Sequence, residues 1–523
     1  MKKKILAIIL SSVLTITSLA GCGSTQPSGS SSSANGKTFI FAQSADPRGL
    51  DPAFVDDGES AKVMCNIYEG LVKYGDDNTN IEPCLAESWE INDAGTEYTF
   101  KLRQGVKFHD GTDFNADAVV KSVERQLPPN ATSDMPYASF TYNGVNKVEA
   151  LDDYTVKFTL DSPNTPFLAN LAMTLAAPIV SPTALEKNNG NLNEAPVGTG
   201  PFKFVSWDKG EKVTLEKNND YWGDKAKLDK LIIKITKESS VRASELMTGE
   251  IDAMDGLDPN DVDKLKEKNM NIFSNPGMNI NYIGFNCQRE PFNNPKLREA
   301  IAHAINREEL VKYLYQGYSD PANTILPSFI PGYKKDVQSY DYNPDTAKSM
   351  LNELGLSNLN IHMITYSPSR QYNSVGGQKL AEAVQNYLSK VGITSTIDVY
   401  QWTEYKEKLQ QGEGDMFFYG WIGDNGDPDN FLSLLDSKEI SSSLNSAKYS
   451  NSDVDSLLAK AKSMPSGDDR NQLYGQIQDI ASKDSPWITL SHANQMAAYS
   501  PKVKNFSLHP TGSIFFKNVD KDN

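Results

Sequence analysis

Alternating apolar and polar residues in the first part of the chain predict a β-rich region with a few helices. Such alternation over short runs is typical of strands that are buried on one face. An apolar stripe at helical spacing predicts a helix at residues 61–72, and Asn115 is a suitable N-cap for a second helix at residues 116–127. The predicted strands are residues 38–42, 96–102, 154–160, 203–207, 212–216 and 231–235.

The second part of the chain changes to an alternation of helices and strands. Asn294, Asn306 and Asn343 each precede a helical pattern and are expected to cap it. A βαβαβ order follows, which predicts an α/β fold with a mainly parallel sheet. Its strands are predicted at residues 362–366, 394–400 and 416–419, its helices at 378–391 and 403–409, and a later strand at 487–490.

The N-terminus has the pattern of a bacterial secretion signal. Three lysines precede an apolar run that ends near Leu14 and is too short to span a bilayer. The sequence Leu19-Ala-Gly-Cys22 resembles the lipobox, so residues 1–21 are expected to be removed and Cys22 to carry a lipid. Residues 22–37 are rich in glycine and serine and predict a flexible tether. The alternative is an ordinary signal peptide with a chance cysteine.

Composition and motifs exclude several classes of function. A formal net charge of −16 argues against nucleic acid and against attraction to anionic lipid. Cys65, Cys84 and Cys287 form no C-x-x-C pair, and the five histidines are scattered, so no metal site and no cofactor are predicted. Cys65 and Cys84 either form a disulfide or remain buried thiols. The motifs of serine hydrolases, P-loops and dinucleotide sites are missing from the sequence, so an enzyme is not expected.

The acidic loop at residues 419–430 is the strongest candidate for a binding site. It follows an apolar run and carries Asp424, Asp427 and Asp429 within six residues. Burying so many carboxylates requires a cation or hydrogen-bond donors, and ligand sites in α/β folds collect beyond the ends of strands. We interpret the loop as a site for a positively charged group. The alternative is a solvated surface turn.

Many short motifs occur in a fixed order along the chain. They include Tyr68-Glu-Gly-Leu71, Leu85-Ala-Glu-Ser-Trp89, Val106-Lys-Phe-His-Asp-Gly111, Gly198-Thr-Gly-Pro-Phe202, Asp220-Tyr-Trp-Gly223, Asn294-Pro-Lys-Leu-Arg-Glu-Ala300 and Trp421-Ile-Gly-Asp-Asn-Gly-Asp-Pro-Asp-Asn-Phe431. With these motifs the chain resembles one family, the extracellular solute-binding proteins of bacterial peptide and nickel importers (family 5). The resemblance covers nearly the whole mature chain and is greatest to the dipeptide-binding members.

The resemblance implies a two-lobed periplasmic-binding-protein-like fold of the cluster C type, which closes around its ligand by a hinge. The first lobe would comprise residues 38–284, with an inserted subdomain at about 77–195. The second lobe would comprise residues 285–492, and residues 493–523 would return to the first lobe. The hinge strands would lie near residues 282–287 and 490–498.

The resemblance also implies the residues that contact the ligand. Asp424 matches an aspartate that holds the α-ammonium group of a peptide, and Arg370 matches an arginine that binds its C-terminal carboxylate. The segment from Gly58 to Lys62 is one residue shorter than in the family. The further residues expected in the wall of the site are Gly58, Tyr372, Gly420 and Trp421.

The function that the resemblance implies is capture of short peptides, either dipeptides or oligopeptides. The loaded protein would deliver them to the permease subunits of an ABC importer, which separate ATPase subunits drive. It would work at the outer face of the cytoplasmic membrane, where its lipid holds it. One alternative is a binder of nickel chelates or another small solute on the same fold. A second alternative, from another class, is a secreted hydrolase that uses two carboxylates.

Overall fold

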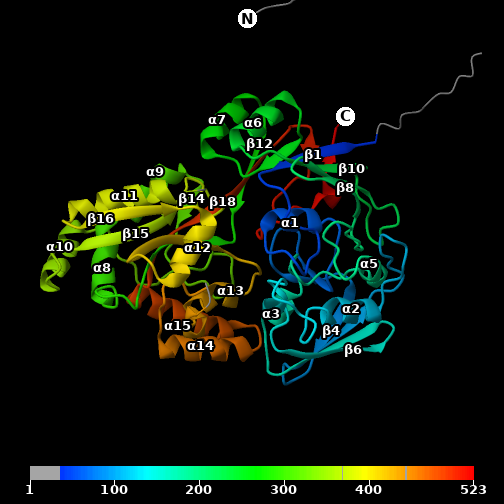
Figure 1. The fold of residues 1–523 in the computed structure, drawn as a ribbon, viewed down its shortest axis with the longest axis horizontal. Coiled ribbons are helices and arrows are strands. Elements are labelled where there is room, and N and C mark those ends of the chain that lie inside the picture. Colours follow the sequence, from blue (N-terminus) through cyan, green and yellow to red (C-terminus); the bar gives the residue numbers. More distant parts are fainter. Residues whose placement is uncertain (1–35, 368, 442–443, 523) are drawn as a thin grey trace, which may run out of the picture. The chain divides into compact units, whose positions relative to one another are not determined.

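The computed structural model describes residues 36–367, 369–441 and 444–522. The predicted signal peptide, Cys22 and nearly all of the tether lie outside the described residues. Lys37 to the C-terminus forms one unit (Figure 1). None of the described helices is both long and apolar enough to cross a bilayer.

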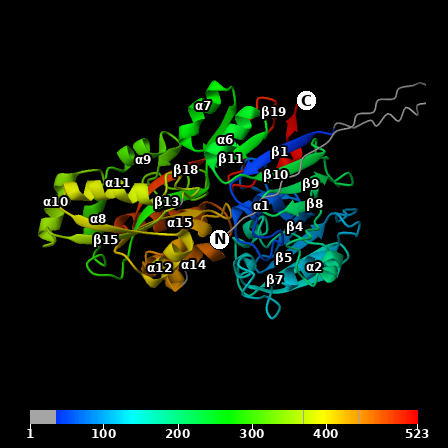
Figure 2. The same ribbon diagram turned by 45° about the horizontal axis from the view of Figure 1, so that its top comes forward.

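A long strand, β18 (Trp487–Tyr499), connects the two halves of a 12-stranded sheet (Figure 2). Its first half pairs with strands of the second lobe, and its second half pairs with strands of the first lobe. On the second-lobe side the order is β16 (Thr394–Tyr400), β15 (Asn360–Tyr366), β17 (Met416–Ile422), β13 (Asn279–Phe285) and β18, with β14 (Ser319–Pro321) beside β18. β13 belongs to the core of this side although nearly all of it precedes residue 284, the predicted end of the first lobe. On the first-lobe side it continues through β11 (Ala253–Asp255), β1 (Thr38–Gln43), β10 (Lys230–Ile235), β9 (Lys212–Lys217) and β8 (Phe202–Asp208), and β12 (Asn271–Pro276) also pairs with β18.

Within the second lobe, the prediction of a parallel sheet holds only for β15, β16 and β17. These strands run parallel and are connected by α11 (Gly377–Lys390) and α12 (Trp402–Gln411), which gives the expected βαβαβ unit. The neighbouring pairs, β17 with β13 and β13 with β18, are antiparallel. A mainly parallel sheet is therefore wrong for the lobe as a whole, because β13 and β18 come from segments outside the βαβαβ order.

Asparagine caps begin the helices where the sequence predicts them. The side chains of Asn115, Asn294, Asn306 and Asn343 each accept a hydrogen bond from a backbone N–H in the first turn. Each cap satisfies one of the N–H groups that a helix start leaves without a partner. The helices are α2 (Ala116–Glu124), α8 (Pro295–Ala304), α9 (Arg307–Tyr315) and α10 (Pro344–Glu353).

The helix predicted at residues 61–72 is wrong in its bounds. The observed helix, α1, spans Gly58–Met64 and is capped by Asp57. Beyond the helix, the carbonyls of Asn66 and Ile67 accept hydrogen bonds from the N–H groups of Phe202 and Gly200, at 3.1 and 2.9 Å. A distant turn thus takes acceptors that a longer helix would need, which helical spacing alone does not reveal.

Glu69 explains why three of the motifs occur together. Its half-buried carboxylate accepts hydrogen bonds from the Tyr221 hydroxyl at 2.7 Å, the Trp222 indole at 2.8 Å and the Thr199 hydroxyl at 2.7 Å. Burial raises the pKa of the Glu69 carboxyl, and the three donors oppose that shift. The motifs around residues 69, 199 and 221 are therefore parts of one hydrogen-bonded cluster.

A separate four-stranded sheet lies within the first-lobe sequence (Figure 1). Its order is β4 (Ala86–Ile91), β5 (Glu97–Leu102), β7 (Thr155–Leu160) and β6 (Val145–Asp152), and it has its own buried core.

The C-terminal tail packs against β1, where Phe506 and Phe516 contact Phe39 and Phe41. The other elements are β2 (Val72–Tyr74), β3 (Ile81–Pro83), α3 (Ala138–Thr141), α4 (Phe167–Asn170), α5 (Pro182–Lys187), α6 (Ser239–Thr248), α7 (Val262–Glu267), α13 (Asp429–Leu432), α14 (Ser452–Ser463), α15 (Asp468–Asp484), β19 (Val503–Lys504) and β20 (Asp520–Lys521).

Gly198 should be essential for packing of this region. A Cβ atom at Gly198 would lie 2.3 Å from the backbone oxygen of Ile67, so the Gly198→Ala variant must move backbone atoms. We expect the free energy of unfolding to fall by about 1–3 kcal/mol. Gly475→Ala is the matched control, because a Cβ there meets only Lys334 at 3.7 Å and alanine favours the helix. Urea unfolding measures both, and equal stability of the two variants would contradict the argument.

Candidate ligand-binding site

A cavity of about 1450 Å³ contains all six residues that the sequence predicts for the site. Its floor is the middle of β18, from Ala493 to Met496. One wall is formed by α1 and the C-terminal tail, and the opposite wall by β17 and the loop after β15. The six predicted residues in its lining are Gly58, Arg370, Tyr372, Gly420, Trp421 and Asp424.

The three aspartates of the acidic loop have different partners. Asp427 forms a buried, bidentate ion pair with Arg470. The Arg470 Nη1–Asp427 Oδ2 distance is 2.7 Å, and the Nη2–Oδ1 distance is 2.9 Å. Asp429 lies 4.0 Å from the ammonium group of Lys462. Asp424 alone of the three lines the cavity, and no described lysine or arginine forms an ion pair with it. Asp427 and Asp429 are only 8% and 9% exposed, so the alternative of a solvated surface turn is wrong.

Asp424 is held by hydrogen bonds from both lobes. The Tyr137 hydroxyl, from the turn before α3, donates to Oδ1 at 2.7 Å, and Asn430 Nδ2 donates to Oδ2 at 3.3 Å. Burial raises the pKa of the Asp424 carboxyl, and these two donors oppose the shift. Asp424 is half-buried, and a carboxylate partly removed from water without a cation is costly, so the site favours a ligand that brings a positive charge.

Arg370 lies on the loop that follows β15. Its backbone exchanges two hydrogen bonds with Asn373, at 2.9 and 2.8 Å. Its guanidinium lies over the ring of Trp402, 3.9 Å from the centroid, and its buried Nε has no acceptor. No described carboxylate forms an ion pair with Arg370, so its charge is available to a ligand in the cavity.

Gly420, Tyr372 and Trp421 support this wall by packing. A Cβ atom at Gly420 would lie 2.4 Å from Tyr372 Cδ2 and 2.5 Å from the backbone oxygen of Ile280. Glycine therefore allows the Tyr372 ring to lie against β17. The Trp421 indole donates to Asn430 Oδ1 at 3.0 Å, and the same oxygen accepts from the Asp424 N–H at 3.1 Å. Asn430 thus fixes both Trp421 and Asp424.

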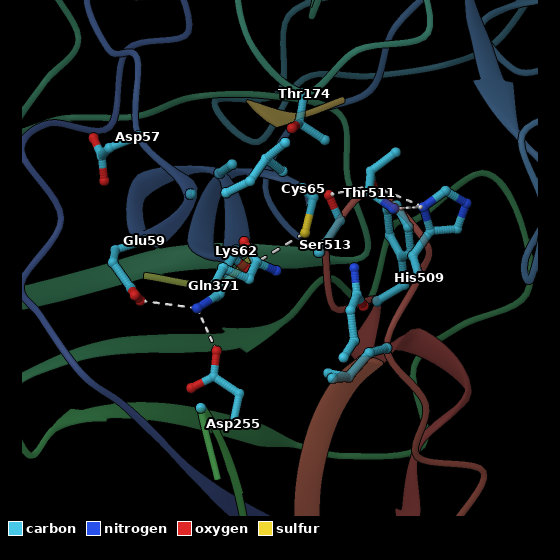
Figure 3. A pocket seen from close by; sticks show the side chains of 18 of the residues that line it. Asp57, Glu59, Lys62, Cys65, Thr174, Asp255, Gln371, His509, Thr511 and Ser513 are labelled. Carbon is cyan, nitrogen blue, oxygen red and sulfur yellow. Dashed lines mark hydrogen bonds and ion pairs between the residues drawn. The ribbon is translucent and has the colours of Figure 1, made fainter. Parts of the chain in front are cut away.

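The first-lobe wall is formed by α1, which Gly58 begins. A side chain at Gly58 would meet no atom within 4 Å. One turn further, the Lys62 ammonium lies between the carboxylates of Glu59 and Asp255 (Figure 3). Burial disfavours the charged lysine, but the two carboxylates outweigh this effect and raise the pKa of Lys62. Sequence reasoning missed this ion-paired cluster, because Asp255 is 193 residues away from Lys62.

The described cysteines form no disulfide. Cys65 and Cys84 are free and buried, which decides between the two alternatives left open by the sequence. Burial raises the pKa of the Cys65 thiol to about 12. A group of possible metal ligands, His362, Asp398 and Glu413, lies outside the cavity, and Glu413 already forms an ion pair with Lys408 at 2.9 Å.

Comparison with known proteins assigns the chain to a family. A family model described as "Bacterial extracellular solute-binding proteins, family 5 Middle" matches residues 80–443. The chain is 35% identical to heme-binding protein A of Haemophilus influenzae, covering 94% of this chain and 93% of the relative. It is 33% identical to the dipeptide-binding protein of Escherichia coli, covering 93% and 95%. The chain therefore belongs to the family 5 bacterial extracellular solute-binding proteins.

Solved structures agree with this assignment. The periplasmic binding protein DppA of Helicobacter pylori, in complex with the peptide STSA, superposes with a TM-score of 0.80 at 37% identity and covers 93% of this chain and 98% of that one. HbpA2 of Haemophilus parasuis gives a TM-score of 0.84 at 31% identity and covers 93% and 100%. The fold is thus the two-lobed periplasmic-binding-protein type. Members of this family are solute-binding components of ABC importers and not enzymes, so the alternative of a secreted hydrolase is wrong.

Asp429 should make stability depend on pH. Burial raises the pKa of its carboxyl to about 6, above the usual value of about 3.9. The folded protein therefore holds this proton more tightly, and the associated stability is present below pH 4 and lost as the pH rises through 6. Asp429→Asn should gain up to about 3 kcal/mol relative to the parent between pH 4 and pH 7. Urea unfolding at both pH values measures the free energies of unfolding. If the difference between Asp429→Asn and the parent is the same at pH 4 and at pH 7, the prediction is contradicted.

Proposed function

We propose that the protein captures short peptides in its interlobe cavity for an ABC importer. The observation that carries this proposal is a pair of opposite charges in one cavity. Asp424 and Arg370 both line it, and neither has an ion-pair partner among the described residues. A peptide with free termini carries one ammonium and one carboxylate group, and it would supply both partners.

Each anchor suits its end of a peptide. The Asp424 carboxylate is fixed by Tyr137 and Asn430, and a fixed carboxylate in a closed cavity forms strong charge-assisted hydrogen bonds with an ammonium group. The planar guanidinium of Arg370 can bind both oxygens of a carboxylate, which a lysine does less well. Recognition through the termini would leave the protein tolerant of different side chains.

The names of several relatives support peptides as the ligands. Several relatives are named as binding proteins for dipeptides or for di- and tripeptides. A nickel chelate is the alternative, since a NikZ structure was solved with Ni(L-His). His509 is the one histidine among the described residues of the cavity lining, and its two nitrogens already face Thr511, Gly75 and Asn78. This lining offers little for direct metal coordination.

Location and delivery complete the proposal. Cys22, which lies outside the described residues, would carry the lipid that attaches the protein to the outer face of the cytoplasmic membrane. The residues that follow it would serve as the tether. The closed, loaded protein would pass its peptide to permease subunits that separate ATPase subunits drive.

Replacing Asp424 should abolish most of the affinity for peptides. Asp424→Asn keeps the shape and removes the charge, which leaves the ligand's ammonium group without its partner. Loss of one member of such a pair costs about 2–5 kcal/mol, so the dissociation constant should rise by roughly 30-fold to several thousand-fold. Calorimetry with Ala-Ala and Ala-Ala-Ala measures the change.

Asp429→Asn is the matched control for Asp424→Asn. It removes a carboxylate from the same loop, but Asp429 is not part of the cavity lining. Its affinity should stay within about threefold of the parent. If the two variants lose the same amount of affinity for the peptides, the loop acts through its summed charge. An Asp424→Asn variant with parental affinity would defeat the peptide assignment.

Replacing Cys22 tests the lipid anchor. The Cys22→Ser variant cannot form a thioether to diacylglycerol, so the mature protein should appear in the soluble fraction instead of the membrane fraction. Cell fractionation with immunoblotting measures the distribution. Cys22→Ser protein that stays with the membrane as the parent does would refute lipidation at this residue.

A further inference from the structure

An aromatic ring, rather than a hydrogen bond, orients the Arg370 guanidinium. The guanidinium carbon lies 3.9 Å from the centroid of the Trp402 ring. The buried Nε of Arg370 has no acceptor, and none of the described carboxylates forms an ion pair with this side chain. The two Arg370–Asn373 hydrogen bonds fix only the backbone. The direction of the side chain therefore depends on its contact with Trp402.

Trp402 is itself held in a fixed position. It is the first residue of α12, and its ring stacks on Tyr419 with the centroids 5.8 Å apart and the planes at 17°. The edge contact with Tyr366 is at 5.3 Å and 90°. Tyr366 is fully buried, and its hydroxyl accepts a hydrogen bond from Asn373 at 3.0 Å. The indole is thus tied to β15, to β17 and to the Arg370 loop.

We propose that Trp402 is a positioning residue for recognition of the ligand's carboxylate. A guanidinium that lies on an aromatic face is attracted by the ring, and its N–H donors stay in its own plane. Those donors can then bind a carboxylate in the cavity without the cost of ordering a free arginine side chain. This inference rests on the proposed function, and it assigns to Trp402 a role that acts through Arg370.

The preference for a free C-terminus tests the inference. The probes are Ala-Ala and its C-terminal amide, and calorimetry gives the ratio of their dissociation constants. The parent should bind the free acid more tightly. Trp402→Leu should reduce this preference by about 3- to 10-fold, because it removes the attraction that holds the guanidinium. Trp402→Phe keeps an aromatic face and should retain most of the preference.

Two further variants isolate the effect. Lys406 is the other cation near the Trp402 ring, at 5.9 Å, and it is exposed. The Lys406→Gln variant should keep the parent's preference, which excludes a general effect of charge. In an Arg370→Gln background, adding Trp402→Leu should cause no additional loss for the free acid, because the group that it orients is gone. If Trp402→Leu fails to fold, Trp402→Met allows the same comparison.

Each outcome has a definite meaning. If Trp402→Leu weakens the acid and the amide equally, Trp402 only packs or touches the ligand, and the inference is overturned. The inference is also overturned if Trp402→Leu lowers the affinity for the free acid as much in the Arg370→Gln background as it does in the parent. If the parent prefers the acid and Trp402→Leu keeps that preference, the inference fails and the proposed function stands. If the parent binds acid and amide alike, the assignment of Arg370 in the proposed function fails as well.

Discussion

The continuity of β18 is the constraint on which the rest of the structure depends. Its first residues belong to the core of the second lobe, and its last residues belong to cores of the first lobe. At the crossing point, Asn279 of β13 exchanges two hydrogen bonds of 2.8 Å with the backbone of Ala493. Residues 493–496, which begin at this point, line the cavity. Because one strand belongs to both lobes, the site lies where its pairing passes from one half of the sheet to the other.

Electrostatics divides the acidic loop into a structural part and a binding part. Asp427 and Arg470 satisfy each other in the protein interior, where an unpaired charge would cost several kcal/mol. This ion pair lies outside the cavity lining and holds the loop in place. Asp424, on the cavity side, has hydrogen bonds but no cation. The loop therefore stays folded without a ligand and still presents one uncompensated carboxylate.

Local signals in the sequence predicted most of the second lobe. Asparagine caps and βαβαβ periodicity depend on residues close in sequence, and α8 to α12 with β15 to β17 follow them closely. The helices α14 and α15 were not predicted. The end of α1 was not predictable, because the Gly200 N–H that takes the Ile67 carbonyl is far away in sequence. The boundaries of the lobes and of the inserted subdomain stay predictions. The residues proposed for the site were named from the resemblance, and their role in binding also stays a prediction.

The sequence did not predict the hydrogen bonds that join residues on opposite sides of the cavity. Tyr137 and Asp424 are 287 residues apart, and no pattern in either segment relates them. Their hydrogen bond joins the predicted inserted subdomain to the predicted second lobe, as does the bond from Asn425 to Asn170 at 2.7 Å. A carboxylate has about four acceptor positions, so Asp424 can accept from Tyr137, Asn430 and an ammonium group together. The residue proposed to bind the ligand also accepts the hydrogen bond from Tyr137. A ligand that binds Asp424 more tightly when this hydrogen bond is present must shift the population of the protein toward the arrangement that contains it.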